Sequence, residues 1–221
     1  MGASIIDVLV EYWPIFLKGT IGTLKYAFIA VSLGTILGAF IALARLSKNK
    51  ILRDVSGVFV TVIRGTPLLV QMYIFYYFLP MAFPVLNKID KVYTVLMSLI
   101  LNSSAYVAEI IRGGINSVDP GQTEAARSLG MTAKHTMTKI ILPQAVKNIL
   151  PALANEYIAM IKETSMAGSF MLYELMYTRT ILANKFLVWQ PLFIIAGIYL
   201  VLTMVLSTGV RWMERRFSVS D

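Results

Sequence analysis

Polar side chains that could bind a solute occur inside otherwise apolar stretches of this sequence. They are Gln71, Asn102, Ser103, Glu163 and Thr164. Ionisable and amide groups are costly at bilayer depth, so they usually mark a solute path or pair with one another. Their chemistry would be charge compensation and hydrogen bonding to a polar solute, not bond making. The competing interpretation is that they only hold helices together, and for Ser103 we favour that one.

Catalysis and metal binding have little support in this sequence. There is no cysteine, so thiolate metal sites and disulfides are excluded, and the single histidine, His135, lacks a nearby partner for a metal cluster or a Ser-His pair. We therefore predict no catalytic residue, no metal site and no cofactor bound by this chain. An intramembrane enzyme stays a weaker alternative without a nucleophile-base pair.

The elements that must position these polar residues are membrane-spanning helices. The chain has 221 residues, of which 57% are hydrophobic and only 14% charged, with a mean hydropathy of +0.70. A spanning helix needs about 20 mostly apolar residues. Five stretches qualify, and the fourth is the most polar: 20–43, 58–79, 92–111, 149–172 and 191–210. We predict an all-α polytopic membrane protein with five transmembrane helices in a single domain, 1–221.

The distribution of basic residues predicts the orientation. Most of the twenty Lys and Arg residues follow the first, third and fifth predicted spans. By the positive-inside rule the N-terminus is outside and the C-terminus is cytoplasmic. Topology thus accounts for the net charge of +8, and no nucleic-acid partner is expected. Residues 1–18 have helical apolar spacing and no signal-peptide pattern, which predicts an interfacial helix on the extracytoplasmic surface.

The longest predicted cytoplasmic connection, 112–148, contains strong helix boundary signals. Asp119 before Pro120 suits an N-cap, Gly130 suits a C-cap, and Thr132 can cap a second short helix ending near Pro143. A helix at about 120–130 would present the small Ala125 and Ala126 for docking. The alternative is an interfacial helix that merely links two spans.

The spacing in this loop resembles the EAA motif of the membrane subunits of bacterial ABC importers. That motif reads Glu-Ala-Ala, three residues, Gly, nine residues, Ile, one residue, Leu-Pro. Every position is met by Glu124, Ala125, Ala126, Gly130, Ile140, Leu142 and Pro143. Five further stretches resemble the permease subunits of polar amino acid ABC importers: 64–67, 105–109, 112–115, 121–122 and 162–165.

The resemblance, which covers about residues 20–210, implies a type I importer fold in a bacterial inner (cytoplasmic) membrane. It implies that Glu124, Ala125, Ala126 and Gly130 belong to a coupling helix seated in a cytoplasmic ATPase. The chain has no phosphate-binding loop, so ATP and Mg²⁺ would be bound by an ATPase dimer. The other implied partners are a second permease copy, identical or closely homologous, and an extracytoplasmic substrate-binding protein, all at the lipid bilayer.

The charge of Glu163 predicts the class of solute. A cation crossing a low-dielectric cavity needs a compensating anion. If Glu163 faces the path, basic or neutral-polar amino acids are preferred over acidic ones. If the helix is turned by about 100°, Lys162 faces the path and the preference inverts. An ion-coupled secondary transporter or channel is the alternative function, but no inverted repeat or filter sequence supports it.

Overall fold

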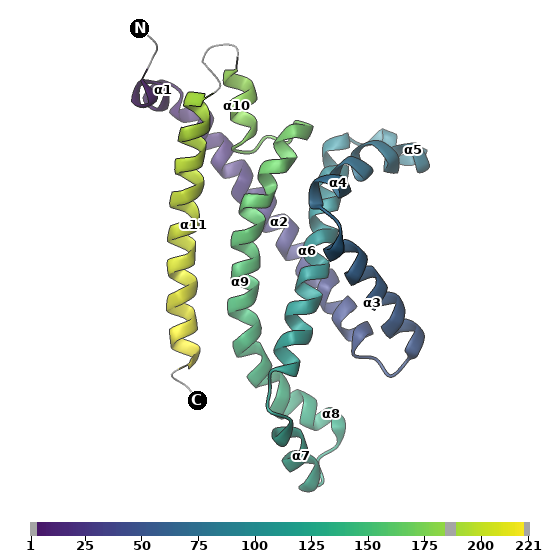
Figure 1. Cartoon of the computed structure of the whole chain (residues 1–221). Helices are drawn as coiled ribbons and strands as arrows, with labels where there is room; N and C mark the ends of the chain where they lie inside the picture. Colours follow the sequence, from purple (N-terminus) through teal and green to yellow (C-terminus); the bar gives the residue numbers. More distant parts are fainter. Residues whose placement is uncertain (1–3, 184–188, 219–221) are drawn as a thin grey trace.

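The computed structural model describes residues 4–183 and 189–218, which form helices joined by short connections (Figure 1). The first two helices, α1 (Ile5–Glu11) and α2 (Trp13–Arg45), meet at Tyr12, whose φ of −109° and ψ of 16° end helix α1. Pro14 stands in the first turn of α2, where a proline costs no hydrogen bond. The predicted helix over 1–18 therefore was too long, because its second half begins α2.

The second predicted span is broken, so the expectation of one continuous helix over 58–79 is wrong. Helix α3 (Lys50–Gly65) ends at Thr66, and α4 (Leu68–Tyr73) follows Pro67. The two halves of this unit are bent by 104°. Pro67 lacks an N–H and disfavours helical backbone at the preceding residue, and Thr66 is accordingly extended. The chain continues through a π-helical turn, Ile74–Phe78, and through α5 (Leu79–Ala82).

Three long helices complete the bundle: α6 (Lys91–Asn116), α9 (Leu142–Ala167) and α11 (Trp189–Ser218). Among the described residues, α2, α6 and α11 are long and apolar enough to cross a membrane, and the bent unit could supply a fourth crossing. Helix α9 packs against all three of these helices. Its charged residues keep it outside that set, so a fifth crossing stays a prediction. The all-α membrane architecture itself is confirmed.

Shorter elements close the two ends of the bundle, which we call the α1 end and the α7 end. At the α1 end lie a 3-10 turn, Pro84–Lys88, a second, Gly168–Phe170, and α10 (Tyr177–Leu182). At the α7 end, α7 (Pro120–Ser128) and α8 (Ala133–Thr136) project away from the bundle (Figure 1).

The second short helix at the α7 end does not stop near Pro143 as predicted. A π-helical turn, Met137–Ile141, follows α8 and leads directly into α9. Pro143 lies in the first turn of α9, where its missing N–H is tolerated. Helix α8 is thus continuous, through this turn, with a long helix of the bundle, whereas α7 is separated from it by the connection 129–132.

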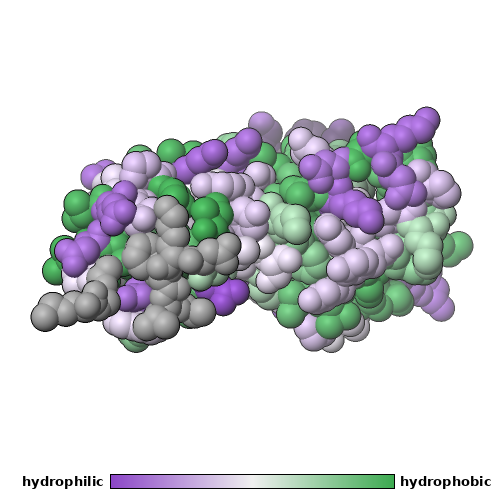
Figure 2. Space-filling view, turned by 90° about the horizontal axis from the view of Figure 1, so that it is seen from above, coloured by the Kyte–Doolittle hydropathy of each residue, from purple (hydrophilic) through white to green (hydrophobic). Residues whose placement is uncertain are grey.

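Helix α2 crosses behind α6 and α9, and small residues make this close approach possible (Figure 1). A Cβ atom on Gly38 would lie 2.8 Å from the backbone oxygen of Ser104, and one on Gly34 would lie 2.8 Å from Cβ of Ser103. Both distances are shorter than real contacts, so these positions require glycine. Seen end-on, hydrophobic residues reach the periphery of the molecule (Figure 2), as expected for a lipid-facing surface.

Candidate functional site

The break between α3 and α4 is closed by a buried pair of amide side chains. Nε2 of Gln71 donates to the backbone oxygen of Ile63 at 2.7 Å and to Oγ1 of Thr66 at 2.9 Å. Nδ2 of Asn102, on α6, donates to Oε1 of Gln71 at 3.1 Å. Two predicted solute ligands therefore lie together, but their hydrogen bonds satisfy the backbone that the break exposes.

Glu163 lies on the face of α9 that is turned toward α6 and α4. Glu156 and Glu163 are seven residues apart, two helical turns, and so share one face of α9, while Phe170 lies in the 3-10 turn that follows this helix. At one end of this face, Oε1 of Glu156 accepts a hydrogen bond from Oγ of Ser103 at 3.0 Å. At the other end, the ring of Phe170 packs on Tyr73 with centroids 4.9 Å apart. Glu163 lies between these two anchors.

The neighbours of Glu163 point in other directions. Glu163 is partly buried and makes no hydrogen bond or ion pair with the described residues, whereas Lys162 is exposed about 100° around the helix. Thr164 is fully buried and its Oγ1 donates to the backbone oxygen of Ile161 at 2.8 Å. The oxygens of the Glu163 carboxylate are therefore free to accept hydrogen bonds. Thr164 does not lie on the same surface of α9 as Glu163.

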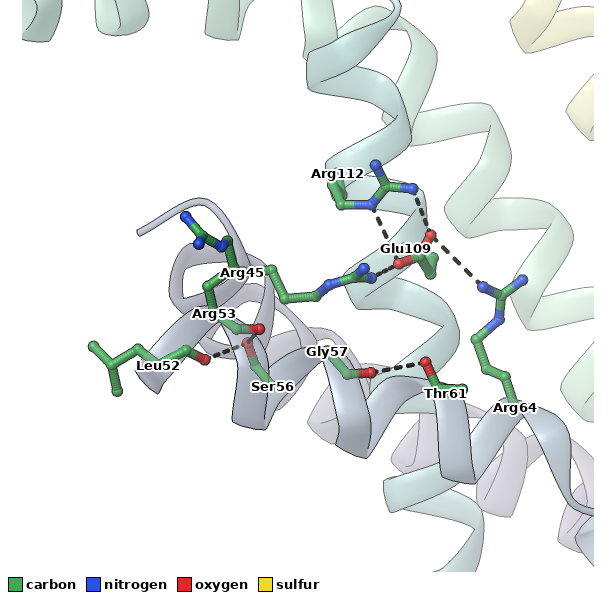
Figure 3. A network of polar contacts seen from close by, with 9 residues as sticks. All are labelled: Arg45, Leu52, Arg53, Ser56, Gly57, Thr61, Arg64, Glu109 and Arg112. Atoms are coloured by element: carbon green, nitrogen blue, oxygen red, sulfur yellow. Dashed lines mark hydrogen bonds and ion pairs between the residues drawn. The ribbon is translucent and has the colours of Figure 1, made fainter. Parts of the chain in front are cut away.

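Three arginines converge on one carboxylate where α2, α3 and α6 meet (Figure 3). Glu109 forms ion pairs with Arg45, with Arg64 at 3.6 Å and with Arg112 at 2.9 Å. The guanidinium of Arg64 also lies 5.1 Å from the ring centroid of Tyr106. The spacing of three residues on one helix favours the pair of Glu109 with Arg112, whereas Arg45 and Arg64 lie on different helices and reach Glu109 only through packing.

The first helix of the loop at the α7 end begins at Pro120 as predicted and ends at Ser128, just before Gly130. The side chain of Asp119 accepts from the backbone N–H of Gly121 at 2.8 Å, and Thr132 caps α8 through the N–H of His135. Gly130 has a φ of +82°, a left-handed conformation that favours glycine. Of the two alanines, Ala125 is exposed and Ala126 is 5% exposed, so only the first is available to a partner.

Sequence reasoning missed two features that the structure makes evident. Leu129 projects from the end of α7 with 85% of its surface exposed, four residues after Ala125 and hence on the same face. The sequence signal was an apolar residue just before the capping glycine. Glu156 lies in the most polar of the predicted spans, and its bond to Ser103 on α6 joins residues 53 apart in the chain, which no local pattern indicates.

A metal centre has no candidate in the described ranges, 4–183 and 189–218: no group of three or more His, Cys, Asp and Glu side chains lies close enough to hold an ion. The polar residues of the bundle are amides, hydroxyls, carboxylates and guanidiniums spread over α3, α4, α6 and α9. Such a set can bind and orient a polar solute by charge and hydrogen bonds.

Comparisons with known proteins agree with this arrangement. A family model described as "Binding-protein-dependent transport system inner membrane component" matches residues 34–219. The putative glutamine transport system permease protein of Rickettsia bellii is 40% identical, with 97% of this chain and 99% of that protein covered. The probable glutamine ABC transporter permease protein of Bacillus subtilis is 36% identical, again covering 97% and 99%.

A solved structure is similar over nearly the whole chain. It is described as a crystal structure of an amino acid ABC transporter with histidines, is 44% identical, and superposes with a TM-score of 0.91 over 98% of this chain and all of that one. The length of the matched region, the sequence identity to the relatives and the fold therefore agree. This chain belongs to the family of binding-protein-dependent transport system inner membrane components.

Proposed function

We propose that this chain is the permease subunit of an ATP-driven importer that moves basic or neutral-polar amino acids into the cytoplasm. The observation that carries the preference is Glu163. Its carboxylate lies on the α6-facing side of α9 without a hydrogen bond or ion pair among the described residues, while Lys162 is exposed elsewhere. A partly buried carboxylate without a hydrogen-bond or ion-pair partner favours a cationic or hydrogen-bond-donating solute.

The relatives support both halves of this preference. Two are described as glutamine permeases, which fits a carboxylate that accepts a hydrogen bond from an amide. The transporter of known structure is described with histidines, which fits a cationic or hydrogen-bonding side chain. An acidic amino acid would face electrostatic repulsion from Glu163.

The assembly that we propose contains two permease chains, an ATPase dimer and a substrate-binding protein. The described helices are too few to enclose a hydrophilic path alone, so a second copy or a close homologue completes it. The α7 end faces the cytoplasm in the bacterial inner membrane, with the N-terminus outside. Glu124, Ala125 and Gly130 belong to the coupling loop, and ATP and Mg²⁺ are bound by the ATPase.

The test is uptake by the complex reconstituted with its ATPase and binding protein. Wild-type uptake of arginine, lysine or glutamine should require ATP and persist when ion gradients are collapsed. Glu163→Gln keeps the size and removes the charge, and should reduce uptake of basic amino acids at least tenfold with assembly intact. The matched control, Lys162→Gln, should keep uptake within about twofold of wild type.

Three results would overturn this assignment. Unchanged uptake of basic amino acids by Glu163→Gln would remove the carboxylate from the path. A wild-type preference for glutamate or aspartate would show that the charge preference is the opposite of the one that Glu163 predicts. Uptake that depends on an ion gradient and not on ATP would select a secondary transporter.

A further inference from the structure

The polar face of α3 borders a cavity with an excess of positive charge. The cavity has a volume of about 420 Å³ and is lined on its polar side by Arg45, Thr61, Arg64, Tyr106 and Glu109. Arg112 joins it through Glu109. Three guanidiniums thus share one carboxylate, and no second carboxylate pairs with them in the part of the chain that the structure describes. Two positive charges remain uncompensated within this group.

Helix α3 separates this cavity from an apolar groove. The groove is lined by Val55 and Phe59 of α3 together with residues of α2 and α6. Val55 and Arg64 are nine residues apart, which places them on opposite sides of a helix with about 100° per residue. The apolar side suits lipid, and the side with Arg64 and Thr61 suits water or a polar solute. A phospholipid seated in the groove would have to pass around α3 to reach the arginines.

The cavity also has a definite depth in the bundle. Glu109 follows Asn102 by seven residues on α6, so it lies two turns, roughly 10 Å, nearer the α7 end. The Gln71–Asn102 pair and the Glu109 cluster are both formed between α6 and the α3–α4 unit. A solute moving from the level of Asn102 toward the α7 end would therefore meet the arginines next.

We infer that this cavity is a transient binding site for the α-carboxylate of the transported amino acid, on the cytoplasmic side of Glu163. The inference rests on the proposed function, because every amino acid carries that carboxylate whatever its side chain. Planar guanidiniums bind carboxylates with paired hydrogen bonds. Arg64 is the best placed to exchange partners, since its contact with Glu109, at 3.6 Å, is longer than that of Arg112 and its side chain is 42% exposed.

A single thiol can report on the cavity because the natural chain has no cysteine. Thr61→Cys places one in the cavity wall, and labelling of this chain by a small neutral thiol reagent is followed by mass spectrometry in the reconstituted complex. Where the wild type transports arginine, L-arginine at millimolar concentration should slow labelling at least threefold. Agmatine, which lacks the carboxylate, should not. Where it transports glutamine, the probes are L-glutamine and 4-aminobutanamide.

Matched variants assign the protection to the arginine in the cavity. Arg64→Gln in the Thr61→Cys background should abolish protection. Arg53→Gln, which removes an exposed arginine of α3 paired with Asp54, should leave it intact. The comparison of analogues needs neither variant, so it decides the matter even if Arg64→Gln fails to assemble.

Several outcomes would overturn the inference. They are equal protection by the decarboxylated analogue, protection retained in Arg64→Gln, or no protection in a complex whose ATP-driven uptake is normal. Protection by phosphatidylglycerol nanodiscs without amino acid, absent in phosphatidylcholine, would identify a lipid phosphate as the occupant instead. A wild-type complex without ATP-driven amino acid uptake would contradict the proposed function, which is a separate result.

Discussion

The side-chain amide of Asn102 on α6 donates to Gln71 on α4, and Gln71 in turn donates to the backbone where α3 ends. One helix thereby stabilises the break in another. The expected consequence is that Gln71→Ala lowers the free energy of unfolding by about 1–3 kcal/mol, because it leaves the buried Asn102 amide without its partner and removes the shortest hydrogen bond to the Ile63 carbonyl. The measurement is the thermal unfolding midpoint in nanodiscs.

The control for this prediction is an exposed amide. Asn148→Ala removes a hydrogen bond to Ser117 of 2.9 Å that is open to solvent, and should change the unfolding midpoint much less. Equal effects of the two substitutions would show that the Gln71–Asn102 pair does not stabilise the break.

The break illustrates how far the sequence predicts this fold. Apolar length alone located α2, α6 and α11, since a long run of hydrophobic residues in a membrane has few alternatives to a helix. The same criterion joined α3 to α4 across Pro67, although proline was a visible signal against a continuous helix. Hydropathy is averaged over a window of about twenty residues, so it does not register a backbone break at a single residue inside that window.

The candidate site was predictable as a set of residues but not as a set of contacts. Gln71, Asn102 and Glu163 were identified because polar groups are rare in spans. Their partners depend on how helices rotate and pack, which no local pattern determines. Thr164, selected as a polar residue in an apolar stretch, and Ala126, selected by its position in the EAA motif, show the same limit, because both are buried in the structure.

The backbone of Gly130 predicts a stability effect in the proposed coupling loop. A Cβ at this position would meet nothing within 4 Å, so any penalty arises from the φ of +82°. Gly130→Ala should cost about 1 kcal/mol, and Gly130→Val should cost more and uncouple ATP hydrolysis from uptake. Stimulation of ATPase activity by loaded binding protein, with uptake in parallel, is the readout.

Gly113 is the matched control for Gly130. It too has open space for a Cβ but lies inside α6 with an ordinary helical φ, and alanine is favourable in a helix. Gly113→Ala should therefore leave coupling and stability unchanged or slightly improved. Normal uptake by Gly130→Val, with normal ATPase binding, would contradict the coupling role of this loop.

Glu174, in the connection between α9 and α10, predicts a pH dependence of stability. Burial raises the pKa of its carboxyl from 4.5 to about 7, although it accepts hydrogen bonds from Met176, Tyr177 and Tyr199. The folded state thus binds this proton more tightly than the unfolded state. The stabilisation is complete below pH 4.5 and is lost as pH rises through 7, by about 3 kcal/mol in total.

Unfolding midpoints between pH 5 and pH 8 check this expectation. Glu174→Gln keeps the side chain's size and removes the titration, so its midpoint should vary less with pH than that of the wild type. Glu11→Gln, at an exposed position near the same end, should retain the wild-type pH dependence. A wild-type midpoint that rises between pH 5 and pH 8 would contradict the sign.

Leu129 predicts where the ATPase makes its apolar contact. Its side chain is 85% exposed at the end of α7, so the isolated chain does not need it to fold. If the partner buries it, Leu129→Gln should remove about 1.5–3 kcal/mol, which is roughly a 10- to 100-fold loss of affinity for the ATPase. Ala125→Glu, on the same face, should act in the same direction by inserting a charge. Titration of the ATPase onto the detergent-solubilised permease measures both.

Met171→Gln is the control for these two variants. Met171 is 69% exposed at the opposite end of the bundle, so this substitution should leave the affinity for the ATPase unchanged. Unaltered affinity in Leu129→Gln would place the docking surface elsewhere on the loop.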